Sequence, residues 1–383
     1  MKVKEVAQIL DRFYPPELAA VWDNVGLQVG DPNQEVNRIM IALDPSELVV
    51  NEAIKAKVDL LVTHHPLVMS GVNRFTTETS IGRVIANLNA NRIALFAAHT
   101  NADVAKDGVN DVLARKFELL DLEPLLPLAA LSDKDRATEG NLLKIVVFSP
   151  AEATEKLIDA MSEAGAGQIG NYDRCAYQVS GVGTFRPQLG ADPYLGQVGE
   201  ITQTQEDRIE MVFRRQHLSG VVEALRRTHP YEEPAYDVIE LVDTDQIGLG
   251  RKGHLARPLT LKVFAERVAA VVPKTHHGVR VSGDLSAKIS TVGVITGAAA
   301  NFLPQVAQRE IDCYVTADAK HHVTLDNLMA SGPNLIDLSH WASESPWCDD
   351  LANRLNAQFT AENKGIEVIV STIMGDPWSL RLP

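Results

Sequence analysis

Short apolar segments that alternate with helical patterns constrain the fold of this chain more than any other feature of its sequence. In the first third, these segments are RIMIAL at 38–43, DLLVT at 59–63 and RIALFA at 92–97. Between the first two, Val50, Ala53 and Ile54 recur at the spacing of one helical face. Short apolar strands joined by helices indicate a largely parallel sheet with right-handed crossovers.

The same alternation returns in the last third of the sequence. Strands are predicted there at Ser290–Thr296, Ile311–Thr316, Leu335–Leu338 and Ile366–Val370. The predicted fold class is therefore α/β, with two similar halves that contain a largely parallel sheet. We expect these halves to be residues 1–135 and residues 251–383.

The middle of the chain, residues 136–250, has a different pattern. Its predicted elements, in order, are Leu142–Phe148, Ala151–Ala164, Ala176–Gly183, Ile209–Phe213, Ser219–Thr228 and Tyr236–Leu241. This β-α-β-β-α-β order is typical of an inserted ferredoxin-like α+β domain. The polar or glycine-rich stretches 132–140 and 243–253 are the expected hinges. After the second predicted helix comes HPYEEP, whose Glu232 and Glu233 could bind a cation, although the motif favours a structured turn.

Composition narrows the class of protein. A chain of 383 residues is long enough for two or three domains. Its net charge of -14 disfavours nucleic acids and anionic membranes as partners, and we find no apolar stretch of the roughly 20 residues that span a bilayer. The three cysteines are scattered and form no CxxC motif, which is typical of a reducing compartment. We therefore expect a cytoplasmic protein.

Histidines and carboxylates follow predicted strands at four places. These are His64 with His65, His99 with Asp103, Asp318 with His321 and His322, and Asp337 with His340 and Glu344. In open α/β sheets, sites assemble at the carboxyl ends of the strands. Imidazole together with carboxylate suits zinc, manganese, iron or nickel. The sequence therefore predicts a divalent metal site, with ligands at His64, His65, Asp103, His340 and Glu344.

The adjacent pair His64 and His65 favours two ions over one. Strand side chains alternate in direction, so each imidazole suits a different ion of a pair about 3.5–4 Å apart. Glu344, with two carboxylate oxygens, could bridge them. Structural roles compete with this interpretation, because Asp103 could cap a turn and Glu344 could be a first-turn carboxylate of a helix that begins at Pro346. The coincidence of these groups at strand ends favours the metal site.

Six stretches of the sequence resemble the Ngg-one-interacting-factor-three-like (NIF-three-like) proteins, also called GTP cyclohydrolase I type-two homologues. They are WDNVGLQVGDP (22–32), LLVTHHPL (60–67), AAHTNADVAKDGVNDVLA (97–114), GAGQIGNYDRC (165–175), HPYEEPAYD (229–237) and LIDLSHWASES (335–345). This combination is far more specific than THHP alone. The sequence departs from the family pattern at Thr316–Ala317–Asp318, where a central glycine is usual, and at TGAAAN (296–301), where alanines replace glycines.

The resemblance implies a pair of divalent ions in each subunit. His65 and Asp103 would bind one ion, His64 and His340 the other, and Glu344 would bridge them. The resemblance also implies a PII-like or CutA-like domain in the middle segment. It further implies a homohexameric ring, a toroidal trimer of dimers, with the metal sites facing an internal cavity.

A dinuclear metal-dependent hydrolase is the function that these residues favour. Two ions can lower the pKa of a bound water from 15.7 towards about 7 and can polarise a substrate oxygen, and His99 or His322 could then transfer protons. The resemblance implies opening of the GTP imidazole ring, while hydrolysis of another nucleotide or a phosphoester uses the same metal chemistry. The alternative is a non-enzymatic, ring-shaped protein that binds metal or a regulatory ligand. A ring that clamps DNA is the least favoured function, because the net charge of -14 does not suggest a basic lining.

Overall fold

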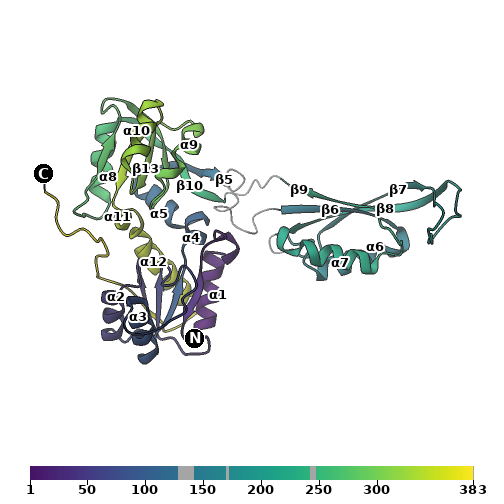
Figure 1. The fold of residues 1–383 in the computed structure, drawn as a ribbon, viewed down its shortest axis with the longest axis horizontal. Coiled ribbons are helices and arrows are strands. Elements are labelled where there is room, and N and C mark those ends of the chain that lie inside the picture. Colours follow the sequence, from purple (N-terminus) through teal and green to yellow (C-terminus); the bar gives the residue numbers. More distant parts are fainter. Residues whose placement is uncertain (128–141, 170–171, 242–246, 383) are drawn as a thin grey trace. The chain divides into compact units, whose positions relative to one another are not determined.

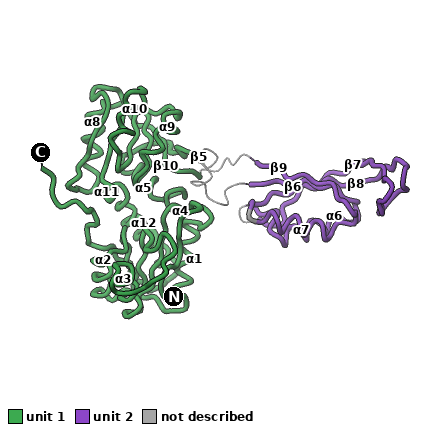
Figure 2. The backbone as a smooth tube through the Cα atoms, in the orientation of Figure 1, with its two compact units in different colours: residues 1–138, 246–383 green, residues 139–245 purple. Residues whose placement is uncertain are grey.

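A computed structural model describes residues 1–127, 142–169, 172–241 and 247–382 of the chain. The chain forms two units, one of Met1–Thr138 with Gln246–Pro383 and one of Glu139–Asp245 (Figure 2). The α/β fold class predicted from the sequence is observed, since both units combine sheets with helices. The expected hinge at 132–140 and the expected boundary after residue 135 lie outside the described residues.

The first sheet of unit 1 has five strands in the order β1-β4-β3-β2-β15. The strands are β1 (Gly26–Val29), β2 (Arg38–Ala42), β3 (Leu60–Thr63), β4 (Ala94–Ala97) and β15 (Glu367–Val370). All pairs are parallel except β1 with β4. The three strands predicted in the first third are thus confirmed, and their continuous apolar sequences follow from burial on both faces.

Helices cover both faces of this sheet (Figure 1). Met40, Leu61 and Leu95 pack into one core with α2 (Glu47–Lys55) and α3 (Ser80–Ala90). The alternate strand residues, Ile41, Val62 and Phe96, belong to another core with α1 (Val3–Phe13) and α12 (Pro346–Ala361). The alternation of strand side chains therefore divides the apolar residues between two layers. Within the described residues, we find no helix long and apolar enough to cross a membrane.

The second sheet of unit 1 has six strands in the order β11-β14-β13-β12-β10-β5. The strands are β5 (Leu120–Pro127), β10 (Gly248–Thr260), β11 (Arg280–Ser282), β12 (Lys288–Val294), β13 (Cys313–Ala317) and β14 (Asn334–Leu338). Only β12, β13 and β14 are parallel to one another. The nearby helices are α5 (Val109–Lys116), α8 (Leu261–Val271), α9 (Leu303–Val306) and α10 (His321–Met329). Side chains of α5 and α8 share one core with these parallel strands.

The two sheets do not follow the first and last thirds of the sequence. β15, from the end of the chain, pairs with β2 in the first sheet. β5, from the N-terminal third, pairs with β10 in the second sheet. The bounds expected for the two halves therefore do not coincide with the two sheets, because apolar periodicity identifies a strand but not its neighbours. The expected hinge at 243–253 also proves to be strand from Gly248 onward.

Unit 2 contains one four-stranded antiparallel sheet in the order β7-β8-β6-β9. Its elements are β6 (Leu142–Pro150), α6 (Thr154–Glu163), β7 (Ala176–Phe185), β8 (Thr202–Arg214), α7 (Leu218–Thr228) and β9 (Tyr236–Glu240). Figure 1 shows both helices on the same face of the sheet. Leu157 and Leu225 from these helices pack with Ile145 and Ile209 of the strands. The predicted β-α-β-β-α-β order is therefore present.

Candidate metal centre

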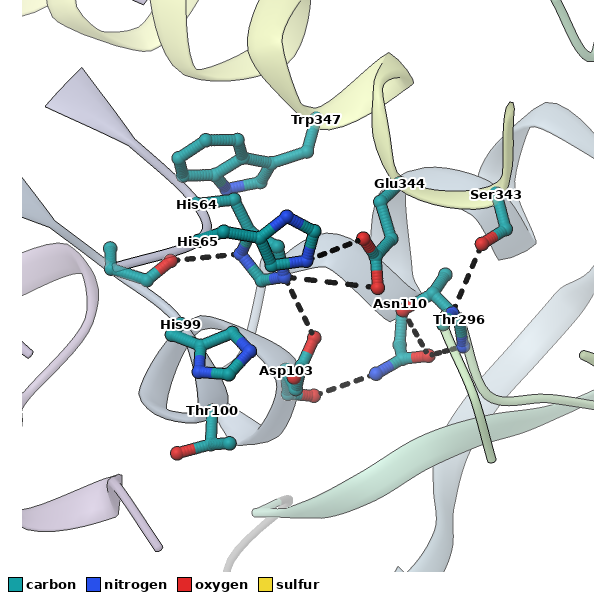
Figure 3. Close-up of polar contacts among 12 residues, drawn as sticks. His64, His65, His99, Thr100, Asp103, Asn110, Thr296, Ser343, Glu344 and Trp347 are labelled. Carbon is teal, nitrogen blue, oxygen red and sulfur yellow. Dashed lines mark hydrogen bonds and ion pairs between the residues drawn. The ribbon is translucent and has the colours of Figure 1, made fainter. Parts of the chain in front are cut away.

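Two neighbouring strands of the first sheet deliver four of the predicted site residues to one place (Figure 3). His64 and His65 directly follow β3. His99 follows β4, and Asp103 lies in the short helix α4 (Thr100–Val104) that comes next. Because β3 and β4 are parallel, their carboxyl ends lie at the same edge of the sheet.

The remaining two predicted ligands come from the second sheet. His340 and Glu344 begin and end α11 (His340–Glu344), which follows β14. Their spacing of four residues places both side chains on the same helix face. The site is thus formed where the carboxyl ends of strands from both sheets of unit 1 meet.

Each of the four histidines has its Nδ1 atom beside an oxygen acceptor. The pairs are His64 with Ala98 O (2.8 Å), His65 with Asp44 Oδ1 (2.7 Å), His99 with Asp23 Oδ1 (2.9 Å) and His340 with Asp318 Oδ2 (2.8 Å). A hydrogen bond from Nδ1 fixes the ring orientation and leaves Nε2 as the ligand atom, as is usual for metal-binding histidines.

The Nε2 atoms of His65 and His340 converge on one oxygen of Glu344. Each lies 3.2 Å from Glu344 Oε2, and the two nitrogens are 3.4 Å apart. Zinc bonds of about 2.0–2.1 Å in a tetrahedron place neighbouring ligand atoms about 3.3–3.4 Å apart. The three atoms therefore have the spacing expected of ligands to one ion.

His64 faces the other oxygen of the same carboxylate. Its Nε2 is 3.9 Å from Glu344 Oε1 and 3.7 Å from Asp103 Oδ1. The nearest atoms thus group His64 with Asp103 and His65 with His340. The family resemblance implies the opposite pairing, His65 with Asp103 and His64 with His340. Glu344 lies between the two groups in either arrangement.

Two buried polar atoms at this place, His64 Nε2 and Asp103 Oδ1, have no hydrogen-bond partner among the described residues, and Glu344 Oε2 has only the two imidazole nitrogens 3.2 Å away. His64 is 0% exposed and Glu344 is 4% exposed. Buried polar groups that lack a partner are costly and rare, but they are satisfied if they bind a cation. The side chains therefore fit divalent ions. Two clusters bring ligand atoms close enough for this, His64 with His65 and His99, and His65 with His340 and Glu344.

Electrostatics at the site favour positive charge beside a buried carboxylate. Burial lowers the pKa of His64 to about 3. Burial also opposes protonation of His65 and His340, but neighbouring carboxylates outweigh it and raise their pKa values to about 10 and about 11. Burial favours the neutral form of Glu344, yet the two histidines hold its pKa well below the ordinary value. Burial and the Glu344 charge raise the pKa of Asp103.

All of the proposed ligands except the fully buried His64 line a cavity of about 480 Å³ in unit 1. Its polar lining includes His65, His99, Asp103, His340 and Glu344. Its apolar lining includes Leu18, Trp22, Met69, Leu249 and Phe302. The volume lies within the range of about 300–1,000 Å³ that is typical of small-molecule sites. The cavity can therefore admit a substrate with both a polar reacting group and an apolar or aromatic part.

A glycine after β12 lets the backbone approach Glu344 closely. Gly297 has a φ of +67°, and a Cβ there would lie 2.3 Å from Glu344 Oε1. Its N–H donates to Ser343 Oγ (3.0 Å), and the N–H of the preceding residue donates to Asn110 Oδ1 (2.8 Å). Asn110 Nδ2 in turn donates to the carbonyl of Asp103 (2.8 Å). These bonds connect the two sheets around the site (Figure 3).

The structure does not bring every predicted residue to this cavity. His322 lies exposed in the first turn of α10, with its ring 5.2 Å from that of His321, and it is not among the residues that line the cavity. Asp337 Oδ2 is instead contacted by His277 Nε2 (2.9 Å) and by Arg280 Nε (2.8 Å). That carboxylate therefore belongs to an ion-pair network.

Sequence reasoning missed the carboxylates that position two of the histidines. Asp44 comes two residues after β2, and this position at a strand end could have identified it as a candidate site residue. Asp23 lies in the WDNVGLQVGDP stretch, but nothing in that stretch names its partner. Trp347, whose ring centroid is 5.5 Å from that of His64, was also not anticipated as a wall of the site.

Comparison with known proteins gives one consistent result. Residues 1–377 match the family described as Duf34/NIF3 (NGG1p interacting factor 3). A Mycobacterium leprae protein named GTP cyclohydrolase 1 type 2 homolog is 41% identical, over 99% of this chain and 95% of its own length. A Bacillus subtilis protein of the same name is 35% identical, over 98% of each chain.

Solved structures agree with the sequence relatives. A Bacillus cereus protein described as related to NIF3 is 34% identical, with a TM-score of 0.71 over 100% of this chain and 99% of its own. A Staphylococcus aureus protein is 30% identical, with a TM-score of 0.80, over 100% of this chain and 99% of its own. These matches extend over both units and all the residues of the candidate metal centre. The chain therefore belongs to the Duf34/NIF3 family.

Proposed function

We propose that this chain is a hydrolase that uses two divalent ions (zinc, manganese, iron or nickel) held by His64, His65, Asp103, His340 and Glu344. The observation that supports this most is the convergence of buried ligand atoms around Glu344, two of which, His64 Nε2 and Asp103 Oδ1, have no hydrogen-bond partner. Such a pair of ions supplies an activated water and polarises a substrate oxygen. The protein orients the ligands through the acceptors on each Nδ1 atom.

We assign proton transfer to His99 and not to His322, because only His99 lines the cavity. Asp23 accepts the hydrogen bond from His99 Nδ1 (2.9 Å), which leaves Nε2 to take up or donate a proton. Burial alone would raise the pKa of Asp23, but bonds from His99 and Thr100 outweigh it and lower the pKa to about 2. Asp23 thus stays ionised and holds the imidazole in one orientation.

A nucleotide-like small molecule is the substrate class that the cavity suits. Trp22 and Phe302 offer aromatic surface to a planar base, while the histidines and carboxylates face the reacting group. The relatives' name, GTP cyclohydrolase 1 type 2 homolog, makes opening of a purine imidazole ring the first reaction to examine. Hydrolysis of a phosphoester is the second, since it uses the same two-ion chemistry.

We also propose the wider organisation that the sequence suggests. Unit 2 would be a ferredoxin-like domain of the PII or CutA type, inserted at about 136–250 between the segments 1–135 and 251–383. Its element order and its strand order β7-β8-β6-β9 support this. The assembly would be a cytoplasmic homohexamer.

A non-enzymatic metal- or ligand-binding regulator is the second candidate function. It is favoured by one observation, a separate cavity of about 290 Å³ within unit 2. In that case the metal centre would be structural or a storage site, with no turnover.

The decisive experiment measures metal content and hydrolysis together on untagged full-length protein. We expect about two ions per chain and turnover of GTP or of another member of a nucleotide and phosphoester panel. Glu344→Gln should lose metal and activity, whereas His99→Gln should keep metal and lose about 10²–10⁴-fold in turnover. His322→Ala is the matched histidine control and should behave like the parent.

Each contrary outcome has a distinct meaning. Full metal content in Glu344→Gln and His65→Ala would show that the ligand assignment is wrong. Two ions without turnover on any member of the panel would refute the hydrolase and favour the regulator. Loss of activity in His322→Ala, with His99→Gln intact, would reverse the assignment of proton transfer.

A further inference from the structure

The cavity within unit 2 has walls that are both aromatic and acidic. Its volume of about 290 Å³ lies just below the range of about 300–1,000 Å³ that is typical of small-molecule sites. Its lining residues come from the end of β7, from the connection between β7 and β8, from β8 and from the segment after α7. The chemically distinctive ones are Phe185, Tyr194, Tyr231, Glu206, Glu232 and Glu233. All of them are separate from the candidate metal centre.

Two aromatic rings of the cavity lining, those of Phe185 and Tyr194, lie beside the ring of Tyr231. Its ring centroid is 6.2 Å from that of Phe185, at an interplanar angle of 53°, and 6.0 Å from that of Tyr194, at 49°. The His229 ring also packs against Tyr231, at 5.0 Å, but Phe185, Tyr194 and Tyr231 all line the cavity and Tyr194 is 51% exposed, so ring surface is available to a ligand. The face of an aromatic ring is electrostatically negative and attracts organic cations.

Carboxylates add negative charge to the same cavity. Tyr231 donates its hydroxyl hydrogen to Glu206 Oε1 (2.7 Å), and Glu232 Oε2 accepts from the Asp192 N–H (3.0 Å). Gly183 leaves the space that Glu206 occupies, because a Cβ there would lie 2.1 Å from Glu206 Oε2. The lining holds three carboxylates against one guanidinium, that of Arg186. The cavity therefore has an excess of negative charge.

We propose that this cavity binds a small organic cation, an alkylamine or a methylated ammonium compound. Ring faces attract the charged and alkylated nitrogen, and the carboxylates neutralise its charge. A bare divalent ion fits less well, because Ca²⁺ and Mg²⁺ require six or more oxygen ligands and aromatic carbons supply none. A phosphate or carboxylate ligand is disfavoured by the excess of acidic side chains. This site is independent of the proposed hydrolase activity.

To test this, the full-length protein is titrated with tetramethylammonium and with putrescine, and binding is measured by calorimetry and by ligand-observed NMR. We expect saturable binding with a millimolar or lower dissociation constant. Glu206→Gln and Tyr231→Leu should each weaken binding by about three- to tenfold. Arg186→Gln should strengthen it, because it removes the competing cation. Glu163→Gln, an exposed carboxylate at the end of α6, is the matched control and should leave binding unchanged.

Several results would overturn the proposal. They are absence of saturable binding by both cations, equal affinity in Glu206→Gln and the parent, and saturable binding of inorganic phosphate in place of the cations. If Tyr231→Leu fails to fold, as judged by its circular dichroism, the opposite effects expected of Glu206→Gln and Arg186→Gln decide the question. Tyr231→Phe, which keeps the ring, should retain most of the binding.

Discussion

Replacing Gly297 by alanine is expected to weaken the candidate metal centre through a single added methyl group. The φ of +67° places this residue in the left-handed region, which costs a non-glycine residue about 1–2 kcal/mol. The new Cβ would lie 2.3 Å from Glu344 Oε1, whereas ordinary contact begins at 3.4 Å, so the carboxylate must move by about 1 Å. Displacing the shared ligand should lower metal affinity by about 10–100-fold, as loss of a supporting group does at other metal sites.

Gly26→Ala separates these two effects. Gly26 also has a positive φ, +95°, but a Cβ there would meet nothing within 4 Å. Both variants should lose stability through the backbone, and only Gly297→Ala should lose metal affinity. Affinity is measured by competition with a chelator, and unfolding by tryptophan fluorescence, which reports on unit 1 alone because Trp22, Trp341, Trp347 and Trp378 all lie outside unit 2. Equal metal affinity in the two variants would refute the reasoning.

Three further predictions rest on the same structure. Arg251→Met should destabilise unit 1 by about 3–5 kcal/mol in denaturant titrations, because it leaves the buried Asp111 carboxylate, which lies 2.7 Å from the Arg251 guanidinium, without its cationic partner. The same substitution at the exposed Arg115 should cost less than about 1 kcal/mol. Similar losses of stability in the two variants would contradict this prediction. Metal binding at neutral pH should release protons, since His65 and His340 have pKa values of about 10 and about 11 without metal. Below those pKa values both imidazoles are protonated, and the protons compete with the metal ion for the ring nitrogens. Metal affinity should therefore rise with pH, and the calorimetric enthalpy of metal binding should change with the buffer. A binding enthalpy that does not depend on the buffer would contradict this prediction. Asp318→Asn should weaken metal binding by about 10–100-fold on chelator competition while leaving unfolding nearly unchanged, and parental affinity would show that the 2.8 Å contact is dispensable.

Strands with continuous apolar sequences could be predicted, including the edge strand β15, whereas β5 and β10 could not. The apolar segments LLVT of β3 and CYVTA of β13 stand out because all of their residues are buried. β5, with the sequence LDLEPLLP, and β10, with GLGRKGHLARPLT, mix charges, glycine and proline. The residues of these two strands are partly exposed and partly buried, so their sequences show no continuous apolar pattern.

The meeting of the proposed ligand side chains at the candidate site could be predicted for a related reason. His64, His65 and His340 each come within two residues of the end of an apolar strand, and parallel strands bring their ends together. The supporting carboxylates are different, because Asp23 meets His99 across 76 residues and Asp44 meets His65 across 21. Those pairings depend on loop paths that carry no periodic signal. The grouping of His65 with His340 likewise required coordinates.

The crossing of β15 into the first sheet has a consequence for synthesis on the ribosome. β2 gains its outer neighbour only when residues 367–370 have been made, long after β2 itself has emerged. His340 and Glu344 also arrive after more than 270 residues have followed His65. A nascent chain therefore carries an incomplete sheet and only three of its five proposed ligands through most of translation, a state prone to non-native pairing. The metal centre would then be complete only after Glu344 has been made, whereas unit 2, whose contacts are local to 139–245, is free to fold first.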